Sequence, residues 1–362
     1  MKRAVICSRT PWKYINTLPD YSLMIVNPDN TPTRLEYLLS HSDWSLMVTD
    51  SGIQERNGPD VGNYRLFHYT SGTTGDSKFY SFTQVQLDIM IEEVRKWYDL
   101  TPNDRYYSVM PLWHGHGQLI YFAAQGAGCE IQFGSVRDQK TIEKFNPTFL
   151  SVIPDIGKLF STFNMPDLRF MGLGSAPITD VDYLKIKERI GVPVINRFGC
   201  TEYLGLSIAN PLYGEQRLGT IGLPVGVDIR VDENKHLWLS GPRLYKEGWY
   251  DTGDLVEQDD DGYITILGRA VDQINIRGYK IDPLSIENQL LNHFPGITEC
   301  AVFGLDRLNC VYVGNETEKE VTTFLSNISS YCKPKMVRSL AEIPKNNIGK
   351  VSRTGLTKLY SQ

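Results

Sequence analysis

The sequence predicts an α/β protein. We expect a large N-terminal domain of layered α/β sheets with a small β subdomain, and a small mobile α+β C-terminal domain. Strand and helix patterns alternate from about residue 60 to 200, which favours a largely parallel sheet. Short strands separated by Gly, Pro and Asp turns follow from 220 to 268. A new set of strand and helix patterns begins past Arg269.

The individual elements follow from apolar spacing. Amphipathic helices are predicted over 34–41 and 87–98, the second with Leu87, Met90, Ile91 and Val94 on one face. A proline near its start predicts a further helix, Pro283 to His293. Short apolar runs predict strands at Phe149–Ile153, Val192–Ile195, Val227–Val231, Leu237–Leu239, Tyr263–Leu267, Ile274–Ile276, Cys300–Gly304 and Cys310–Val313.

These elements predict two domains. We expect a large domain over 1–268, with the β subdomain at 220–268, and a small C-terminal domain over 269–362. The stretch from Ile343 to Arg353 is rich in Lys, Asn and Gly, which is typical of a surface loop.

Length and charge limit the class of function. The chain has 362 residues, enough for one large and one small domain. Its net charge of −5 argues against nucleic acid or an anionic membrane as the main partner. The six cysteines form no CxxC pair, and no apolar run approaches the ~20 residues of a membrane span. We therefore expect reduced cysteines and a cytoplasmic enzyme.

A loop of hydroxyls, glycines and one lysine spans 69–78, with the sequence Tyr-Thr-Ser-Gly-Thr-Thr-Gly-Asp-Ser-Lys. Glycines let the backbone approach a polyphosphate, hydroxyls and amides donate hydrogen bonds, and Lys78 adds a charge. The loop is not a Walker motif, because Ser77 replaces the glycine before the lysine and Phe79 replaces the hydroxyl after it. A plain polar turn is the alternative interpretation.

The loop resembles the phosphate-binding signature of the adenylate-forming superfamily, which includes acyl-CoA synthetases, aryl-CoA ligases, luciferase and peptide-synthetase adenylation domains. Further segments are similar to that family's motifs and follow in its order. They are Gly174–Pro177, Asn196–Glu202, Tyr250–Leu255, Gly268–Arg269 with Arg277–Ile281, and Asn347–Arg353. An upstream stretch from Asn27 to Leu39 is also similar to the family, but it begins almost at Met1, so the chain looks like an N-terminally shortened member.

The resemblance implies a nucleotide site. The loop over 69–78 would hold the phosphates of ATP. The segments Gly174–Pro177 and Asn196–Glu202 would contact adenine. The implied phosphate residues are Ser71, Gly72, Thr73, Thr74, Gly75 and Lys78. The implied adenine-side residues are Gly174, Ser175, Ala176, Pro177, Asn196, Phe198 and Gly199, with Phe198 stacking on the base. Core packing is the alternative role for Phe198, and most family members have tyrosine there.

The resemblance also implies that 1–268 is the adenylation core and that 269–362 is a mobile C-terminal lid domain that carries the catalytic lysine. It assigns catalytic roles to single residues as well. Thr201 would contact the α-phosphate, Glu202 would bind Mg²⁺, and Asp254 would accept hydrogen bonds from the ribose hydroxyls with Arg269 beside it. Lys350 would bridge the substrate carboxylate and the α-phosphate, and His114 would lie at the mouth of the acyl pocket. The alternatives are a helix-capping acid for Glu202, a turn-capping acid for Asp254 and an exposed lysine for Lys350. His114 and His116 form a His-x-His, but without an evident third ligand they do not predict a metal site.

Two departures from the family pattern affect the expected activity. In the family, a hinge after Arg269 lets the C-terminal domain rotate between acid activation and transfer of the acyl group. Val271 stands where this hinge usually has Asp or Lys, so the transfer step is less certain than the activation step. The shortened N-terminus would leave apolar surface, which a second copy of the chain or a partner chain would cover.

The predicted function is the activation of a carboxylic acid by ATP to acyl-AMP and pyrophosphate, followed by transfer to a thiol. CoA or a phosphopantetheinyl carrier protein would supply that thiol. The alternatives are a non-thiol acceptor, or a non-catalytic nucleotide- or acyl-binding relic. We expect an aryl or acyl acid without an α-amino group, because Ser108 to Gln125 contains no Asp or Glu to pair with an ammonium.

Overall fold

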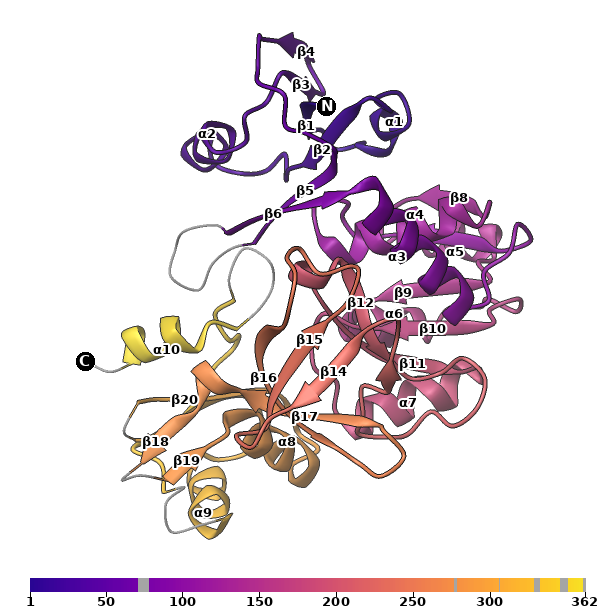
Figure 1. Cartoon of the computed structure of the whole chain (residues 1–362). Coiled ribbons are helices and arrows are strands. Elements are labelled where there is room, and N and C mark those ends of the chain that lie inside the picture. The colour runs from indigo at the N-terminus through magenta and orange to yellow at the C-terminus, as the bar shows by residue number, and fades with distance from the viewer. Residues whose placement is uncertain (71–77, 277–278, 306, 329–332, 346–350, 361–362) are drawn as a thin grey trace.

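The computed structural model of the chain describes residues 1–70, 78–276, 279–305, 307–328, 333–345 and 351–360 (Figure 1). Its described residues form layered α/β sheets followed by smaller antiparallel sheets, which is the class predicted from the sequence. No helix in these ranges is long and apolar enough to cross a membrane.

The N-terminal part of the chain builds a six-stranded sheet in the order β4-β3-β1-β2-β5-β6. The strands β1, β2 and β3 pair in parallel, and β5 and β6 close one edge as an antiparallel pair. The elements are β1 Lys2–Cys7, α1 Trp12–Ile15, β2 Tyr21–Ile25, α2 Pro32–Ser40, β3 Leu46–Thr49, β4 Gly52–Glu55, β5 Tyr64–Thr70 and β6 Lys78–Thr83.

A seven-stranded sheet follows, in the order β13-β12-β11-β10-β9-β7-β8. Strands β8, β7, β9, β10 and β11 run parallel, and β12 and β13 are antiparallel. Its strands are β7 Arg105–Ser108, β8 Glu130–Phe133, β9 Phe149–Val152, β10 Phe170–Leu173, β11 Val194–Cys200, β12 Gly205–Ala209 and β13 Leu223–Pro224. Its helices are α3 Gln84–Trp97, α4 Gly115–Gly126, α5 Gln139–Phe145, α6 Pro154–Phe160, α7 Asp180–Ile190 and the 3₁₀ turn η1 Thr201–Tyr203.

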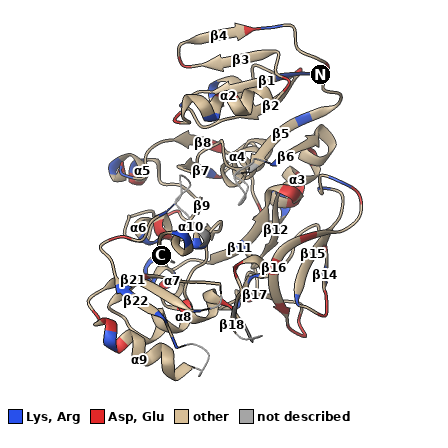
Figure 2. Ribbon diagram, turned by 90° about the vertical axis from the view of Figure 1, so that its left-hand side faces the viewer, with Lys and Arg blue, Asp and Glu red and all other residues tan. Residues whose placement is uncertain are grey.

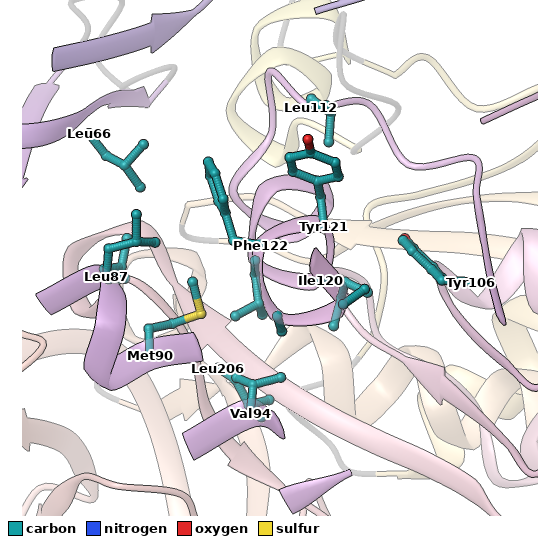
Figure 3. Close-up of a cluster of buried hydrophobic side chains, with 14 of the residues drawn as sticks. Leu66, Leu87, Met90, Val94, Tyr106, Leu112, Ile120, Tyr121, Phe122 and Leu206 are labelled. Atoms are coloured by element: carbon teal, nitrogen blue, oxygen red, sulfur yellow. The ribbon is translucent and has the colours of Figure 1, made fainter. Parts of the chain in front are cut away.

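The two sheets share a core through helices α3 and α4 (Figure 3). Leu87, Met90 and Val94 form the buried face of α3, as the apolar spacing predicts. They lie in one cluster with Leu66 of β5 and Phe122 of α4. Helix α3 begins at this position because Thr83 and Gln86 form a capping box.

The predicted β subdomain is an antiparallel sheet in the order β14-β15-β16-β17. Its strands are β14 Asp228–Val231, β15 His236–Ser240, β16 Tyr250–Gln258 and β17 Ile264–Arg269. The C-terminal part follows with η2 Ala270–Asp272, β18 Ile274–Ile276, β19 Tyr279–Ile281, α8 Pro283–His293, β20 Ile297–Phe303, β21 Asn309–Gly314, α9 Glu318–Ile328, β22 Met336–Ser339 and α10 Arg353–Tyr360.

The strand and helix predictions agree with these elements within a few residues at each end. The surface loop expected over 343–353 is wrong at both of its ends. Ile343 is fully buried beside Leu356, and Arg353 is the first residue of helix α10. The division into domains 1–268 and 269–362 stays a prediction. The expectation that a second chain covers apolar surface at the N-terminus also stays a prediction.

Arg353 joins the start of α10 to two other segments of the C-terminal part. Its Nη2 donates to Glu287 of α8 at 2.6 and 2.9 Å, and its Nη1 donates to Asp272 of η2 at 3.1 Å. Burial raises the pKa of the Glu287 carboxyl to about 7, and the guanidinium opposes that rise. Since the pKa of Glu287 in the folded state exceeds its unfolded value, this carboxyl lowers stability as pH rises from about 4.5 to 7.

We predict that Arg353→Met lowers the free energy of unfolding by about 3 kcal/mol at pH 8, because a buried carboxylate loses its partner. The loss should be smaller at pH 5, where Glu287 is protonated. Urea denaturation at both pH values measures it. The control is Lys235→Met, whose exposed ion pair with Glu257 should contribute less than about 1 kcal/mol. A pH-independent loss for Arg353→Met would contradict the prediction.

Candidate active site

The candidate site is built on the carboxyl ends of three parallel strands. The pairing of Val152 with Leu173, and of Leu173 with Asn196, brings β9, β10 and β11 to the same edge. Chain leaving a parallel sheet at this edge commonly forms a ligand site. The segments that leave here carry Ser175 and Thr201, two residues predicted for the nucleotide.

Glu202 lies in the 3₁₀ turn after β11 and contacts a strand of the first sheet. The hydroxyl of Tyr80 on β6 donates to Glu202 Oε1 at 2.8 Å. Burial and the Glu202 carboxylate raise the pKa of Tyr80, so the phenol stays protonated as a donor. The backbone carbonyl of Glu202 accepts from the amide of Tyr245 at 3.0 Å. The turn is therefore fixed from two sides.

Three tyrosines line the region around Glu202. The rings of Tyr80 and Tyr245 meet edge to face with centroids 4.9 Å apart, and those of Tyr245 and Tyr250 with centroids 6.0 Å apart. Burial, and then the charge of Glu202, raise the pKa of Tyr250 as well. The raised pKa values keep the phenols of Tyr80 and Tyr250 protonated, so neither places a second negative charge beside Glu202.

Asp254 and Arg269 face each other on neighbouring strands β16 and β17. Arg269 Nη1 lies 3.2 Å from Asp254 Oδ1, and its Nη2 donates to the Thr252 carbonyl at 3.2 Å. Asp254 is 5% exposed, whereas half of the Arg269 side chain is exposed. Gly253, which precedes Asp254, has φ +73°, a conformation that favours glycine, and a Cβ there would lie 3.3 Å from Arg269 Nη2. The predicted pair is thus in direct contact.

Cys200, the last residue of β11, is affected by both carboxylates. Burial is the main cause that raises the pKa of its thiol, and the charges of Glu202 and Asp254 raise it further. The charges of both carboxylates, one in the turn after β11 and one on β16, therefore reach the Cys200 thiol.

The turn after β10 contains Gly174, Ser175, Ala176 and Pro177. The last three are exposed, as an adenine-contacting surface requires. Ser175 has φ +67°, which a residue other than glycine adopts at a cost and often at a functional site. A side chain at Gly174 would lie 3.0 Å from Arg197 Cγ, so glycine permits this close approach.

The predicted adenine-side residues on β11, Asn196, Phe198 and Gly199, each have contacts within the protein. Phe198 is partly buried and packs against the core cluster of the β subdomain, so its predicted stacking on adenine stays a prediction. Asn196 donates through Nδ2 to the Thr220 carbonyl at 2.9 Å. A side chain at Gly199 would come within 2.1 Å of the Gly205 carbonyl, so glycine is required there.

His114 immediately precedes α4, and the neighbouring Gly115 borders the site. A methyl group at Gly115 would lie 3.9 Å from Thr201 Oγ1 and 4.0 Å from His68 Nδ1. The structure therefore brings the predicted acyl-pocket segment next to the predicted α-phosphate contact. Burial lowers the pKa of His68 to about 4, so this imidazole is neutral.

Part of the predicted site lies outside the described residues. Lys78 is exposed at the start of β6, where it pairs with Thr70 of β5. The other predicted phosphate residues and the catalytic lysine are not in the described ranges; they are Ser71, Gly72, Thr73, Thr74, Gly75 and Lys350. Their roles stay predictions.

Magnesium fits the described residues through Glu202 alone. Within the described ranges, no group of three or more His, Cys, Asp or Glu residues could hold a metal ion. A single carboxylate suits Mg²⁺, which is commonly bound by one or two carboxylates together with substrate phosphates.

Sequence reasoning missed several residues of the site. Tyr80, Tyr245 and Tyr250 come from three separate segments, and nothing in their spacing indicated that they would surround Glu202. Ser151 and Arg197 both contact His116. Arg197 stands inside a recognised motif, one residue before Phe198, but its side chain had no predicted role.

Comparison with known proteins places this geometry in a family. The family model of the AMP-binding enzymes matches residues 59–242, which contain Thr201 and Glu202. The chain belongs to the AMP-binding enzyme family. This confirms the predicted adenylate-forming membership.

Relatives in this family are CoA ligases. Oxalate–CoA ligase of Arabidopsis thaliana is 29% identical over 88% of this chain and 71% of its own length. Sulfoacetate–CoA ligase of Cupriavidus necator is 28% identical over 92% of this chain and 82% of its own. A rice protein named 4-coumarate–CoA ligase-like 4 is 26% identical over 80% of this chain and 62% of its own.

The fold is that of solved family structures. ATP-bound MatB from Rhodopseudomonas palustris superposes with a TM-score of 0.88 at 20% identity, covering 100% of this chain and 89% of that one. This confirms the predicted fold class.

We predict that Asp254→Asn weakens ATP binding by about 10- to 100-fold, because a buried charge-assisted hydrogen bond is worth about 1.5–3 kcal/mol. Isothermal calorimetry with ATP measures the change. Asp228→Asn, an exposed carboxylate on β14, is the matched control and should bind ATP as the parent does. Equal affinity in Asp254→Asn and the parent would contradict the ribose role.

Proposed function

We propose that this chain activates a carboxylic acid with ATP, forming acyl-AMP and pyrophosphate, and then passes the acyl group to the thiol of CoA. One observation carries the proposal: Tyr80 of the first sheet holds Glu202, in the turn after β11, at 2.8 Å, and the charges of Glu202 and Asp254 both act on the Cys200 thiol at the end of β11. The CoA ligase names of the relatives support the same reaction class.

In the first half-reaction, a carboxylate oxygen of the acid attacks the α-phosphorus of ATP. A new O–P bond forms, and the bond to the β-phosphate oxygen breaks as pyrophosphate leaves. Negative charge collects at the α-phosphate, so catalysis needs positive charge and fixed donors rather than a protein nucleophile. Bound Mg²⁺ would supply Lewis-acid stabilisation of the phosphate oxygens.

The described residues divide this work. Glu202 is oriented for a cation because Tyr80 holds its Oε1 at 2.8 Å. Thr201 offers its hydroxyl to the α-phosphate, close to Gly115 at the start of α4. Asp254 accepts from the ribose hydroxyls, while Arg269 holds one of its carboxylate oxygens. Lys350 would add a cation between the two reacting groups.

In the second half-reaction, the thiol sulfur forms a bond to the acyl carbon, the bond from that carbon to the AMP phosphate oxygen breaks, and the thiol proton is released to solvent. CoA is the proposed thiol; a carrier-protein phosphopantetheine is the other acceptor to test. The C-terminal part over 269–362 is proposed to rotate between the two half-reactions about the segment that holds Val271. Val271 is 75% exposed, so no core packing of its side chain opposes rotation.

The acid is proposed to lack an α-amino group. The described window Ser108–Gln125 supplies no carboxylate for an ammonium. The relatives are named for oxalate and sulfoacetate in two cases and for 4-coumarate in the third, so their names support a carboxylic acid of varied structure.

We predict that the purified chain catalyses acid-dependent exchange of pyrophosphate into ATP, and acid-dependent thioester formation with CoA. Lys350→Ala should slow exchange by about 10²–10³-fold, because a charge that acts in the transition state is lost. Thioester formation from preformed acyl-AMP should change far less.

The matched control is Lys335→Ala, which removes an exposed lysine of the same part of the chain and should exchange at the parent rate. No exchange with any acid in a broad panel would refute the proposed function. Exchange at the parent rate in Lys350→Ala would refute the role of that lysine alone.

A further inference from the structure

His68 is a buried polar side chain that the described residues leave partly unpaired. It lies on β5 and is 8% exposed, and its ring meets that of Phe82 edge to face with centroids 5.8 Å apart. Its Nε2 is buried without a hydrogen-bond partner in that part of the chain. An unpaired polar atom in a protein interior is costly, so an imidazole at this position requires an explanation other than core packing.

Gln118 of α4 determines which ring nitrogen of His68 carries the proton. The Gln118 side chain is 5% exposed, and its Nε2 donates to the Leu112 carbonyl at 2.6 Å. Its Oε1 is therefore left as an acceptor, and this atom is also buried without a partner in the described ranges. Gln118 opposes the lowering of the His68 pKa, as an acceptor beside an imidazole N–H does. A neutral imidazole has one N–H, so Nε2 carries it toward Gln118 and Nδ1 is left as an acceptor.

The acceptor nitrogen of His68 faces a space at the start of α4. A Cβ at Gly115 would lie 4.0 Å from His68 Nδ1 and 3.9 Å from Thr201 Oγ1. No other described atom beyond the adjoining residues of α4 comes within 4 Å of that point. The missing side chain of Gly115 thus leaves room for a small group between an acceptor nitrogen and a hydroxyl.

This space lies at the reacting end of the proposed site. Thr201 is the predicted α-phosphate contact, and His68 pairs across β5 and β6 with Tyr80, whose hydroxyl holds Glu202 at 2.8 Å. The first turn of α4 has amides without intrahelical acceptors, and its dipole favours an anion such as the carboxylate that is activated. A substituent on the carbon next to that carboxylate would therefore reach His68 Nδ1.

Only a ligand group that donates a hydrogen bond matches this nitrogen. A hydroxyl donates to Nδ1 and accepts from the Thr201 hydroxyl at the same time. An ammonium would need a carboxylate beside it, because a buried unpaired charge is costly, and Glu202 and Asp254 are proposed for magnesium and ribose. A hydrogen atom or a methyl group would leave Nδ1 unpaired.

We propose that His68 binds the hydroxyl group of a 2-hydroxy acid, with Gln118 as the positioning residue that fixes the imidazole proton on Nε2. The substrate is then a small acid with a hydroxyl on the carbon next to the activated carboxylate. This rests on the proposed function and names its substrate class. The spacing of the sequence gave no sign of it, because His68 and Gly115 are brought together only where β5 meets α4.

The test uses matched acids that differ in one hydroxyl: glycolate against acetate, and lactate against propanoate. Pyrophosphate exchange by the parent chain should have a kcat/KM about 3- to 10-fold higher for the hydroxy acid of at least one pair, the worth of one neutral hydrogen bond. His68→Leu should remove this preference and change kcat/KM for the unsubstituted acid by less than about twofold. His68→Asn, which keeps an acceptor near the position of Nδ1, should retain part of the preference.

Gly115→Ala is a second variant, which tests the space if His68 variants do not fold. Its methyl group would meet the nearest atoms at 3.9 and 4.0 Å without a clash, and alanine favours a helix. This variant should also lose the preference for the hydroxy acid. The control is His293→Leu, which removes a histidine that stacks on Phe324 in the C-terminal part and should keep the preference.

Nitrogen-15 NMR of labelled imidazoles tests the same site without turnover. The His68 signals, identified by their loss in His68→Leu, should show a neutral ring protonated on Nε2. Glycolate or lactate, added with AMP, should move the Nδ1 signal, and acetate or propanoate should leave it unchanged.

Faster exchange with both unsubstituted acids, faster exchange with alanine than with lactate, or an equal loss for both acids in His68→Leu would overturn the proposal. So would a His68→Leu variant that slows only thioester formation, because His68 would then serve the thiol. If no acid supports exchange, the proposed function fails. A hydroxyl-dependent shift of the Nδ1 signal would still support the subsite, whereas an equal shift with both acids of a pair, or none, would overturn it.

Discussion

The parallel register of β9, β10 and β11 is the constraint on which the site depends. Backbone pairing aligns Val152, Leu173 and Asn196, so the chain leaves all three strands at one edge. Because side chains alternate along a strand, the end of β11 serves two purposes at once. Arg197 faces the core shared with α3 and α4, and Cys200 faces the carboxylates Glu202 and Asp254. Slipping this register by one residue would exchange the two faces.

The second requirement is that the other sheets reach this edge. Tyr80 comes from the first sheet and fixes Glu202 through one hydrogen bond. The β subdomain contributes Asp254 and Arg269 from adjacent strands, held by their pairing across β16 and β17. Figure 2 shows that positions of acidic and basic residues are spread along the ribbon of many elements, and they are not gathered in one place. Charge alone therefore gives no guide to its position.

Much of this arrangement could be predicted from the sequence. Apolar spacing predicted the elements, and the order of the motifs predicted part of the site. Apolar spacing located α3 and α8, because a periodic buried face is a local signal. Motif order located Glu202, Asp254 and Arg269. Tyr80 and Arg197 gave no such signal, since their roles arise from contacts between segments far apart in the chain. Arg197 stood in a recognised motif, but only its burial without an acidic partner among the described residues distinguishes it from Arg243, which pairs with Glu93.

The proposed chemistry is that a carboxylate of the substrate is joined to AMP at this edge of the sheet, and that the acyl group is then transferred to CoA with release of AMP. Labelling the oxygens of the carboxylates with heavy oxygen tests it directly, with the preferred acid, ATP and CoA, and mass spectrometry of the products. The account predicts one labelled oxygen in AMP and none in pyrophosphate, because the bond formed is between carboxylate oxygen and the α-phosphorus. Label in inorganic phosphate together with ADP, or thioester formed with unlabelled AMP, would contradict it.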